Sequence, residues 1–483
     1  MLVEECHLAG KLFSGDWHDA KHAVDAREPA TGAVIAKVGY AGRDEIGQAA
    51  ARARLAHSDW AEGAPDARAA ILSAAARLAG EHAEEIIVWL MRESGSVRPK
   101  AEFELGITIK ALQLASGMPH QAQGLVLPSE GNRLSLARRR PLGVVGVISP
   151  FNFPLYLAMR AVAPAFAVGN AVVLKPDPRT AVCGGYVIAR LFELAGLPSG
   201  LLAVMPGERD AGAALCEDPN VAMIQFTGST NAGRAVGEVA SRHLKKVSLE
   251  LGGKNSLIVL EDADIELAVK NAAWGAWLHQ GQICMTAGRI FVHASIIDQF
   301  AAKLAEKARQ LPAGDPMSGQ VALGPLISPN QCDHAKDILD QSVAAGAELL
   351  AGGEVNGLIM QPAVLSMVGE QMAAYREEIF GPVAVLVPFE SDDDAVRMAN
   401  DTEYGLAAAV ISKDVARAMA LGHRLHAGLI HINDQTVNDD VVNPFGGVAA
   451  SGNGTSIGGP ANWEAFTHWQ WMTIKSAPPA YPF

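Results

Sequence analysis

The residues from Leu278 to Arg289 place one cysteine, Cys284, among two glycines and two glutamines, directly after an apolar helical run. A lone cysteine in a protein is usually a small buried hydrophobic residue whose packing says nothing about its reactivity. Glycines and glutamines are unusual in a packed core, because glycine lets the backbone approach a ligand closely and the amide adds hydrogen-bonding groups. Cys284 is therefore a candidate nucleophile.

Five apolar runs in the middle of the chain are followed by small or polar residues. The runs do not alternate with polar residues, and helical segments separate them, which is typical of parallel strands covered on both faces. Right-handed connections between such strands give a doubly wound parallel sheet, whose ligands bind at the carboxyl ends of the strands. The expected strands span residues 144–148, 171–174, 201–204, 221–226 and 247–251.

Each of these strand ends offers a different chemical group. Asn152 follows the first run with an amide, Lys175 follows the second with an ammonium group, and Gly207 follows the third. The stretch 226–233 combines glycines, hydroxyls and free backbone N–H groups at a helix start, which favours an anion. The last run reaches the carboxylate of Glu250. Each group alone is unspecific, but five successive strand ends together indicate a ligand cleft.

A second block of alternating strands and helices extends from about residue 252 to residue 450. Its expected helices lie near residues 264–280, 296–311, 330–345 and 391–400. Its expected strands lie at residues 256–260, 290–293, 383–387, 407–411 and 428–432.

The flanking regions have other patterns. Residues 1–42 are typical of short strands and turns, and residues 44–116 are alanine-rich and helical. Asp66 is expected to cap one helix of this region. The apolar residues of that helix share one face: Ile71, Leu72, Ala75 and Leu78.

A hairpin is expected within residues 118–140, because two apolar segments flank a Ser-Glu-Gly-Asn turn. The hairpin is interpreted either as an ordinary surface hairpin or as an arm that contacts another subunit. In the second interpretation it pairs with the aromatic, strand-like segment 466–474.

Composition excludes several classes of protein. The chain has 483 residues and a net charge of −13, and its only basic block is Arg138–Arg140, so neither nucleic acid nor an anionic membrane is expected as a partner. Five cysteines without a CxxC motif argue against a disulfide framework or a structural metal site and favour the cytoplasm. No signal peptide is visible, and prolines, asparagines and an arginine interrupt the apolar segment 141–174, so no spanning helix is expected.

Seven motifs, in order along nearly the whole chain, resemble those of the aldehyde dehydrogenase superfamily. Their order and spacing make the resemblance specific. They are Pro150–Pro154, Leu174–Pro176, Phe226–Ser229, Leu249–Asn255, Gly281–Cys284, Glu377–Pro382 and Pro444–Gly447.

The resemblance implies an α/β fold with three parts. A doubly wound parallel-sheet domain for NAD(P) would comprise residues 1–117 and 143–251, and an α/β catalytic domain residues 252–450. A small β arm, residues 118–142 and 460–483, would form a homodimer or homotetramer.

The resemblance also assigns the catalytic residues. Cys284 would be the nucleophile, Glu250 the general base, and Asn152 an oxyanion donor together with the backbone N–H of Cys284. This set suits aldehyde oxidation, because hydride can leave only from a tetrahedral carbon bearing an oxyanion, which attack by a thiolate creates. The resulting thioester needs an activated water, and no metal is required.

The cofactor implied is NAD, with NADP also accepted. Lys175 and Glu378 would hold the two riboses, Ser229 a phosphate, and Phe380 the nicotinamide side of the cleft. Two positions depart from the family pattern: Phe151 replaces a common tryptophan, and Pro178 replaces a glutamate that would repel a 2′-phosphate. The expected cofactor-binding residues are Ser149, Pro150, Phe151, Lys175, Gly207, Thr227, Gly228, Ser229, Gly233, Leu251, Gly252, Glu378 and Phe380.

Within the superfamily, the chain is similar to the benzaldehyde dehydrogenase branch, which oxidises aromatic aldehydes. Segments 98–100, 278–285, 431–435 and 481–483 carry this similarity. The expected substrate is a small aromatic aldehyde. The expected pocket residues are Phe153, Leu157, Leu278, Ile283, Met285, Val442 and Phe445.

Other reactive residues receive structural interpretations. Cys183 and Cys216 are expected in the core, and His279 in a structural or pocket-wall role. His431 and Asp434 either shape the substrate entrance or are structural, and Glu377 is expected to be a surface charge.

Several functions compete with aromatic aldehyde oxidation. The alternatives of the same class are vanillin, salicylaldehyde or general aliphatic aldehyde oxidation. A coenzyme A-acylating dehydrogenase is a different reaction, which Glu250 disfavours because water activation needs that base. A non-catalytic binding or structural relative is the remaining alternative, which Cys284, Glu250, Asn152 and Lys175 argue against.

Overall fold

The computed structural model describes residues 1–483, and its first sheet contains the five expected parallel strands. The first and last residues of these strands in the structure differ by at most one position from those expected from the sequence. Two short antiparallel strands extend the sheet at one edge. The strand order is β11 (Lys246–Glu250), β10 (Val221–Thr227), β7 (Val144–Ile148), β8 (Ala171–Lys175), β9 (Leu202–Val204), β1 (Lys11–Phe13) and β2 (Trp17–Asp19).

The first strand of the parallel set, β7, lies in the middle of the five parallel strands. Strands β8 and β9 add on one side of it, and β10 and β11 add on the other. All five strands are parallel, so their carboxyl ends meet at one edge. The order reverses between β7 and β10, which is where sheets of this kind hold a ligand.

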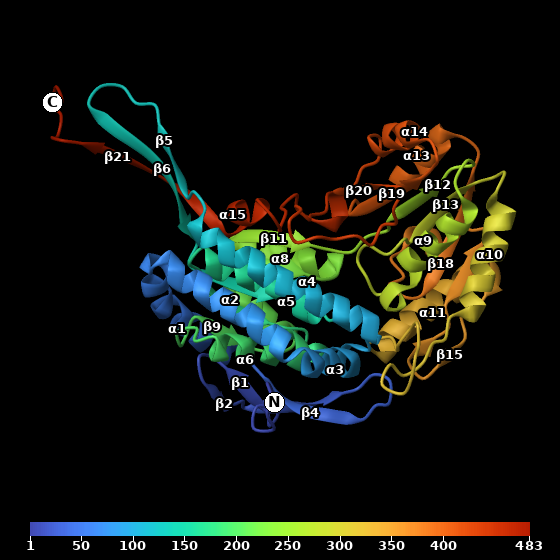
Figure 1. Ribbon diagram of the computed structural model, residues 1–483, viewed down its shortest axis with the longest axis horizontal. Helices are drawn as coiled ribbons and strands as arrows, with labels where there is room; N and C mark the ends of the chain where they lie inside the picture. Colours follow the sequence, from blue (N-terminus) through green and yellow to red (C-terminus); the bar gives the residue numbers. More distant parts are fainter.

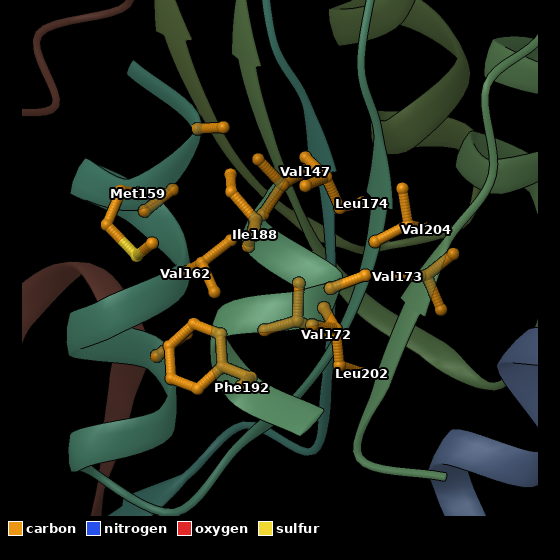
Figure 2. Packing of buried hydrophobic residues seen from close by; sticks show 14 of the residues in the cluster. Val147, Met159, Val162, Val172, Val173, Leu174, Ile188, Phe192, Leu202 and Val204 are labelled. Carbon is orange, nitrogen blue, oxygen red and sulfur yellow. The ribbon is translucent and has the colours of Figure 1, made fainter. Parts of the chain in front are cut away.

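Helices cover both faces of this sheet. Figure 2 shows side chains of α5 and α6, such as Met159, Val162 and Phe192, packed against Val172 and other strand residues. Cys183 and Cys216 are buried in this core, as predicted. The helices are α1 (Arg43–Glu62), α2 (Pro65–Glu81), α3 (Ala83–Ser94), α4 (Arg98–Gly117), α5 (Pro154–Ala167), α6 (Val187–Leu194), α7 (Arg209–Glu217) and α8 (Thr230–Arg242).

The predicted cap at Asp66 is wrong. Helix α2 begins one residue earlier, at Pro65, and Asp66 lies in its first turn. Proline is favoured at the first helical position because its fixed φ suits the helix and its missing N–H is not needed there. The apolar face is as predicted: Leu72, Ala75 and Leu78 are buried, and Ile71 is partly buried.

A second seven-stranded sheet contains all five strands predicted for the second block. The sequence did not predict β14 and β17, which are four residues long. Its order is β14 (Glu348–Ala351), β17 (Ala363–Ser366), β18 (Val383–Phe389), β13 (Arg289–His293), β12 (Ser256–Val259), β19 (Ala407–Ile411) and β20 (Leu429–Ile432).

The helices of the second block also agree with the sequence pattern, except that two were not predicted, the short α12 (Ala373–Arg376) and α14 (Val415–Gly422). The other four lie where they were expected: α9 (Ile265–Trp277), α10 (Ile297–Gln310), α11 (Pro329–Ala344) and α13 (Asp392–Asn400). None of the helices in the chain is both long enough and apolar enough to cross a membrane.

The predicted hairpin forms, and the C-terminal strand pairs with it. Strands β5 (Gly124–Leu127), β6 (Arg133–Pro141) and β21 (Thr467–Lys475) make an antiparallel sheet, called the arm below. The arm extends away from the rest of the chain (Figure 1). Apolar side chains on it are exposed, among them Val126 and Trp471, the latter 67% accessible. The hairpin of β3 (His22–Arg27) and β4 (Val34–Tyr40) lies apart from it.

The fully buried Arg289 joins the start of β13 to neighbouring segments of the second sheet. Its guanidinium donates hydrogen bonds to the carbonyl groups of Lys254, Met398, Ala399 and Asp401, at 2.9 to 3.2 Å. Arg289→Met should therefore lower the free energy of unfolding by about 3 kcal/mol, because buried carbonyl groups lose their donors. The measurement is the midpoint of urea unfolding.

The control for this prediction is Arg77→Met. Arg77 is exposed and pairs only with Glu81 on the same helix, so its loss should change the free energy by less than about 0.5 kcal/mol. Equal midpoints for the two variants would contradict the role given to Arg289.

Candidate active site

The loop that carries Cys284 is held in an unusual backbone conformation. After α9, three successive residues have positive φ angles: His279 at 49°, Gln280 at 57° and Gly281 at 68°. Such angles are uncommon for residues with side chains. A Cβ atom at Gly281 would lie 2.2 Å from the carbonyl oxygen of Gly381, so only glycine fits there. Strain of this kind persists only where the surroundings enforce it, and it concentrates at functional sites.

The two glutamines near Cys284 bind backbone, so the interpretation that they supply amides to a ligand is wrong. Gln280 donates from Nε2 to the carbonyl oxygens of Gly95 at 3.0 Å and Pro325 at 2.9 Å. Gln282 accepts at Oε1 from the backbone N–H of Ile327 at 3.0 Å. Both side chains are fully buried, so their amides fix the strained loop to its neighbours.

Two hydrogen-bond donors converge near the thiol. Asn152 donates from Nδ2 to the carbonyl oxygen of Gln282 at 2.9 Å, which leaves its second amide hydrogen available. The backbone N–H of Cys284 makes no hydrogen bond within the protein. Asn152 and Cys284 line one cavity, so this pair of donors could stabilise an oxyanion formed on a carbon bonded to the sulfur.

A buried carboxylate faces the same cavity. Glu250 is the last residue of β11, is 4% accessible, and neither of its carboxylate oxygens makes a hydrogen bond. Burial raises the pKa of Glu250 well above its usual value; nearby Arg160 opposes this rise and Asp439 adds to it. A carboxylate with a raised pKa can accept a proton from water or a thiol near neutral pH.

The thiol of Cys284 is itself strongly perturbed. Burial raises its pKa to about 12, and the carboxylates of Glu378, Glu250 and Asp439 act in the same direction. The thiol is therefore protonated at neutral pH, and it needs a base before it can attack a carbonyl carbon.

The cavity has a volume of about 670 Å³, and most of its lining residues are apolar. Its buried cations are paired: Asp439 accepts from Arg160 at 2.7 Å and also from the hydroxyl of Tyr156 at 3.0 Å. Lys100, which also lines it, pairs with Glu104 at 2.5 Å. Six of the seven expected pocket residues line the cavity: Phe153, Leu157, Leu278, Ile283, Met285 and Phe445.

The prediction for the seventh pocket residue, Val442, is wrong. Its side chain is 47% accessible and lies outside the cavity. The preceding residue, Val441, is buried among the residues around the cavity. Adjacent side chains in this turn point to opposite sides, so Val441 occupies the interior and Val442 faces solvent.

The sequence model of the aldehyde dehydrogenase family matches residues 17–472. The chain belongs to this family. It is 52% identical over 484 residues, covering 100% of both chains, to a vanillin dehydrogenase of Amycolatopsis sp.. It is 45% identical over 476 residues, covering 98% of each chain, to a benzaldehyde dehydrogenase [NAD(+)] of Pseudomonas putida.

A solved structure gives the same result for the fold. A salicylaldehyde dehydrogenase from Pseudomonas putida G7, complexed with salicylaldehyde, superposes with a TM-score of 0.95 at 32% identity. The superposition covers 98% of this chain and 99% of that one. The resemblance inferred from the seven motifs is thus confirmed at the level of family and fold.

The expected cofactor-binding residues of this aldehyde dehydrogenase lie mainly at the carboxyl edge of the first sheet. Lys175 ends β8 and is buried, and its side-chain ammonium group donates no hydrogen bond within the protein. Ser149 follows β7, and its buried hydroxyl has no partner. Ser229 caps α8 and accepts from the N–H of Ala232 at 3.4 Å. Free donors and acceptors at such an edge fit the hydroxyl and phosphate groups of a dinucleotide.

Glu378 and Phe380 reach this edge from the loop that precedes β18 of the second sheet. Glu378 accepts from the N–H of Gly253 at 3.0 Å, and burial raises its pKa to about 7. A Cβ atom at Gly252 would lie 2.2 Å from the carboxylate of Glu378. Phe380, at a positive φ of 51°, packs edge-on against Phe151 with ring centroids 5.9 Å apart.

Some glycines of the expected cofactor site also have packing reasons. A Cβ atom at Gly233 would lie 2.3 Å from the side chain of Leu251, and one at Gly228 2.7 Å from the ring of Phe226. A Cβ atom at Gly207 would likewise lie 2.7 Å from the carbonyl oxygen of Ala41. Pro150 lies in the turn after β7, and Thr227 is the last residue of β10.

The remaining interpretations can be compared with the structure. His279 is fully buried, its ring packs against Phe153 with centroids 5.9 Å apart, and burial lowers its pKa, so it is a neutral structural residue. Asp434 lines the cavity, whereas His431 does not. Glu377 is exposed, as predicted.

Sequence reasoning missed a group of cavity residues on α4 and α5. Their helical spacing places them on one face of each helix, and this was the signal that the sequence offered. Spacing alone, however, does not show whether that face packs in the core or lines a cavity. They are Lys100, Phe103, Ile107, Tyr156 and Arg160.

The raised pKa of Cys284 predicts how the thiol responds to pH in the cofactor-free enzyme. Alkylation by iodoacetamide needs the thiolate, whose fraction rises about tenfold per pH unit below the pKa. The alkylation rate of Cys284, followed by peptide mass spectrometry, should therefore keep rising between pH 7 and pH 10. A plateau below pH 9 would contradict the assignment. The exposed Cys6 in the same samples controls for reagent activity.

Proposed function

We propose that this enzyme oxidises an aromatic aldehyde of the benzaldehyde type to the carboxylic acid, with NAD as the oxidant. The observation that carries the proposal is that Cys284, Glu250 and Asn152 line one largely apolar cavity. The similarity to enzymes named for vanillin, benzaldehyde and salicylaldehyde supports the substrate class.

The first half of the reaction is addition to the carbonyl group. Cys284 gives its proton to solvent water, and its sulfur forms a bond to the aldehyde carbon while the π electrons of the carbonyl group move to its oxygen, giving a thiohemiacetal oxyanion. Asn152 Nδ2 and the N–H of Cys284 donate to that oxyanion. A donor fixed in advance stabilises the charge that develops in the transition state, and losing one costs roughly 100- to 1,000-fold in rate.

The second half is release of the acyl group. Once hydride has left the tetrahedral carbon, Cys284 carries a thioester. Glu250 takes a proton from water, the water oxygen attacks the thioester carbon, and the carbon–sulfur bond breaks to give the carboxylate. Burial without hydrogen-bond partners keeps Glu250 basic enough for this step.

The residues at the carboxyl edge of the first sheet fit NAD. The ammonium group of Lys175 and the carboxylate of Glu378 would hold ribose hydroxyls, and the Ser229 end of α8 would hold a phosphate. Phe380 and Phe151 would bound the nicotinamide end. When bound, NAD accepts the hydride. Pro178 carries no carboxylate to exclude a 2′-phosphate, so NADP is proposed as a weaker alternative.

The parts of the chain have separate roles in this proposal. Residues 1–117 and 143–251 bind the cofactor, and residues 252–450 carry the nucleophile. The arm, with residues 118–142 and 460–483, joins subunits into a homodimer or homotetramer, since its exposed apolar side chains need a partner surface. The free cysteines support a cytoplasmic location.

Substitution of the two reacting residues should separate the steps. Cys284→Ala should abolish turnover while NAD binding, measured by protein fluorescence, stays within about twofold. Glu250→Gln should slow thioester release, so a burst of NADH precedes a steady rate lowered by about 100-fold or more. A Glu250→Gln enzyme with the normal steady rate would contradict the general-base role.

The cavity predicts a preference for uncharged aromatic aldehydes. Its buried cations Lys100 and Arg160 are already paired with carboxylates, so a negatively charged aldehyde finds no free cation in the buried part of the cavity. We expect kcat/KM for benzaldehyde or vanillin to exceed that for hexanal by about tenfold, and that for succinic semialdehyde by more.

A preference for succinic semialdehyde would overturn the aromatic assignment. Benzaldehyde, vanillin and salicylaldehyde in the same panel report the ring substituents that the cavity prefers. Coenzyme A in a parallel assay should not raise the rate, because water is the proposed acyl acceptor.

A further inference from the structure

An ion pair is completely buried on α4, beside the cavity. The Nζ atom of Lys100 lies 2.5 Å from Oε2 of Glu104, four residues later, and both side chains are 0% accessible. Removing two charges from water costs several kcal/mol per ion, and their mutual attraction repays that cost only with additional hydrogen bonds. Such a pair needs an explanation beyond the stability of one helix.

The additional contacts of Lys100 all lead to the segment that begins α5. Its Nζ atom donates to the backbone carbonyl oxygen of Asn152 at 2.6 Å. It also lies 4.0 Å from the centre of the Phe153 ring, within the range of a cation–π interaction. The ammonium group thus donates hydrogen bonds to Glu104 and Asn152 and lies against the ring of Phe153.

Glu104 holds the next residues of the same segment. Its Oε1 atom accepts from the backbone N–H groups of Leu155 at 2.9 Å and Tyr156 at 3.2 Å. These N–H groups lie in the first turn of α5, where the helix provides no acceptor, and the N-cap residue Phe153 makes no side-chain cap. A carboxylate at this end also interacts favourably with the helix dipole.

We propose that Lys100 and Glu104 are positioning residues that hold Asn152 so that its side-chain amide points at the oxyanion. The proposal rests on the role of Asn152 given under the proposed function. The carbonyl of Asn152 is fixed by Lys100, and its amide by the carbonyl of Gln282 in the cysteine loop. The residue is thus held between α4 and the nucleophile, and loss of Lys100 frees one side of it.

Lys100→Met removes the ammonium group and keeps a chain of similar length. The rate of hydride transfer in a single turnover, followed as NADH absorbance with benzaldehyde, should fall by about 10- to 100-fold, a part of the loss for a missing oxyanion donor. The NAD dissociation constant should stay within about twofold, because Lys100 lines the substrate cavity and its contacts are not with the expected cofactor-binding residues. In the steady state, kcat should fall more than KM rises.

A double-mutant cycle with Asn152→Ala separates positioning from a general structural role. If Lys100 acts through Asn152, Lys100→Met should change the single-turnover rate of the Asn152→Ala enzyme by less than about twofold. Equal fold-losses in the two backgrounds would overturn the positioning role and leave the oxyanion assignment intact. A normal rate for Asn152→Ala alone would overturn both.

A second variant covers the case in which Lys100→Met does not fold. Lys100→Met/Glu104→Gln removes both charges, and the new amide oxygen can still accept from the N–H groups of α5, so the fold should be retained. This double variant should lose as much hydride-transfer rate as Lys100→Met is expected to lose. In the Asn152→Ala background, the two changes should again alter the rate by less than about twofold. A folded double variant with the normal rate would overturn the proposal.

Glu93→Gln is the matched control. Glu93 is likewise fully buried, and its carboxylate accepts from two successive backbone N–H groups, those of Val182 at 3.0 Å and Cys183 at 2.7 Å. It does not line the cavity. Glu93→Gln should leave the single-turnover rate within about twofold, and a loss as large as that of Lys100→Met would overturn the specific role of the Lys100–Glu104 pair.

Discussion

The register of three parallel strands is the constraint on which the site depends. Strand β10 pairs with β7 on one side, with Phe226 opposite Ile148, and with β11 on the other, with Thr227 opposite Glu250. Backbone hydrogen bonds therefore bring the ends of these strands to one level. Glu250 and the segment that leads to Asn152 reach the same edge because the sheet aligns them, although about a hundred residues separate them in the chain.

The nucleophile comes to that edge from the other side. The loop of Cys284 belongs to the second block of the chain, and the glutamine amides bind it to Gly95, Pro325 and Ile327. Its backbone takes three positive φ angles in succession, which the surrounding contacts enforce. Rigid anchoring lets the N–H of Cys284 remain without an internal partner, as a donor for the substrate should be.

Burial governs the chemistry of the whole site. It raises the pKa of Glu250 and of Cys284 and lowers that of Lys100, and each shift disfavours the charged form. Only some of these buried charges have a partner that offsets the cost of burial. Lys100 and Arg160 receive carboxylate partners, whereas Glu250 receives no hydrogen bond. Structural charges are thus satisfied, and the carboxylate proposed as the base is left free to react.

The sequence by itself determined the five parallel strands of the first sheet, five of the seven strands of the second, the hairpin and the catalytic candidates, because uninterrupted apolar runs, turn residues and strand-end motifs are local signals. It failed at Asp66 because the proline before it begins the helix. It failed at Gln280, Gln282 and Val442, and it gave Lys100 no role, because each of these depends on a partner distant in the chain or on the direction of a side chain. Spacing places Lys100 on a helix face, but only tertiary packing puts the carbonyl of Asn152 within 2.6 Å of its ammonium group. The physical reason is that desolvation and hydrogen-bond geometry are properties of the folded surroundings, which no local pattern encodes.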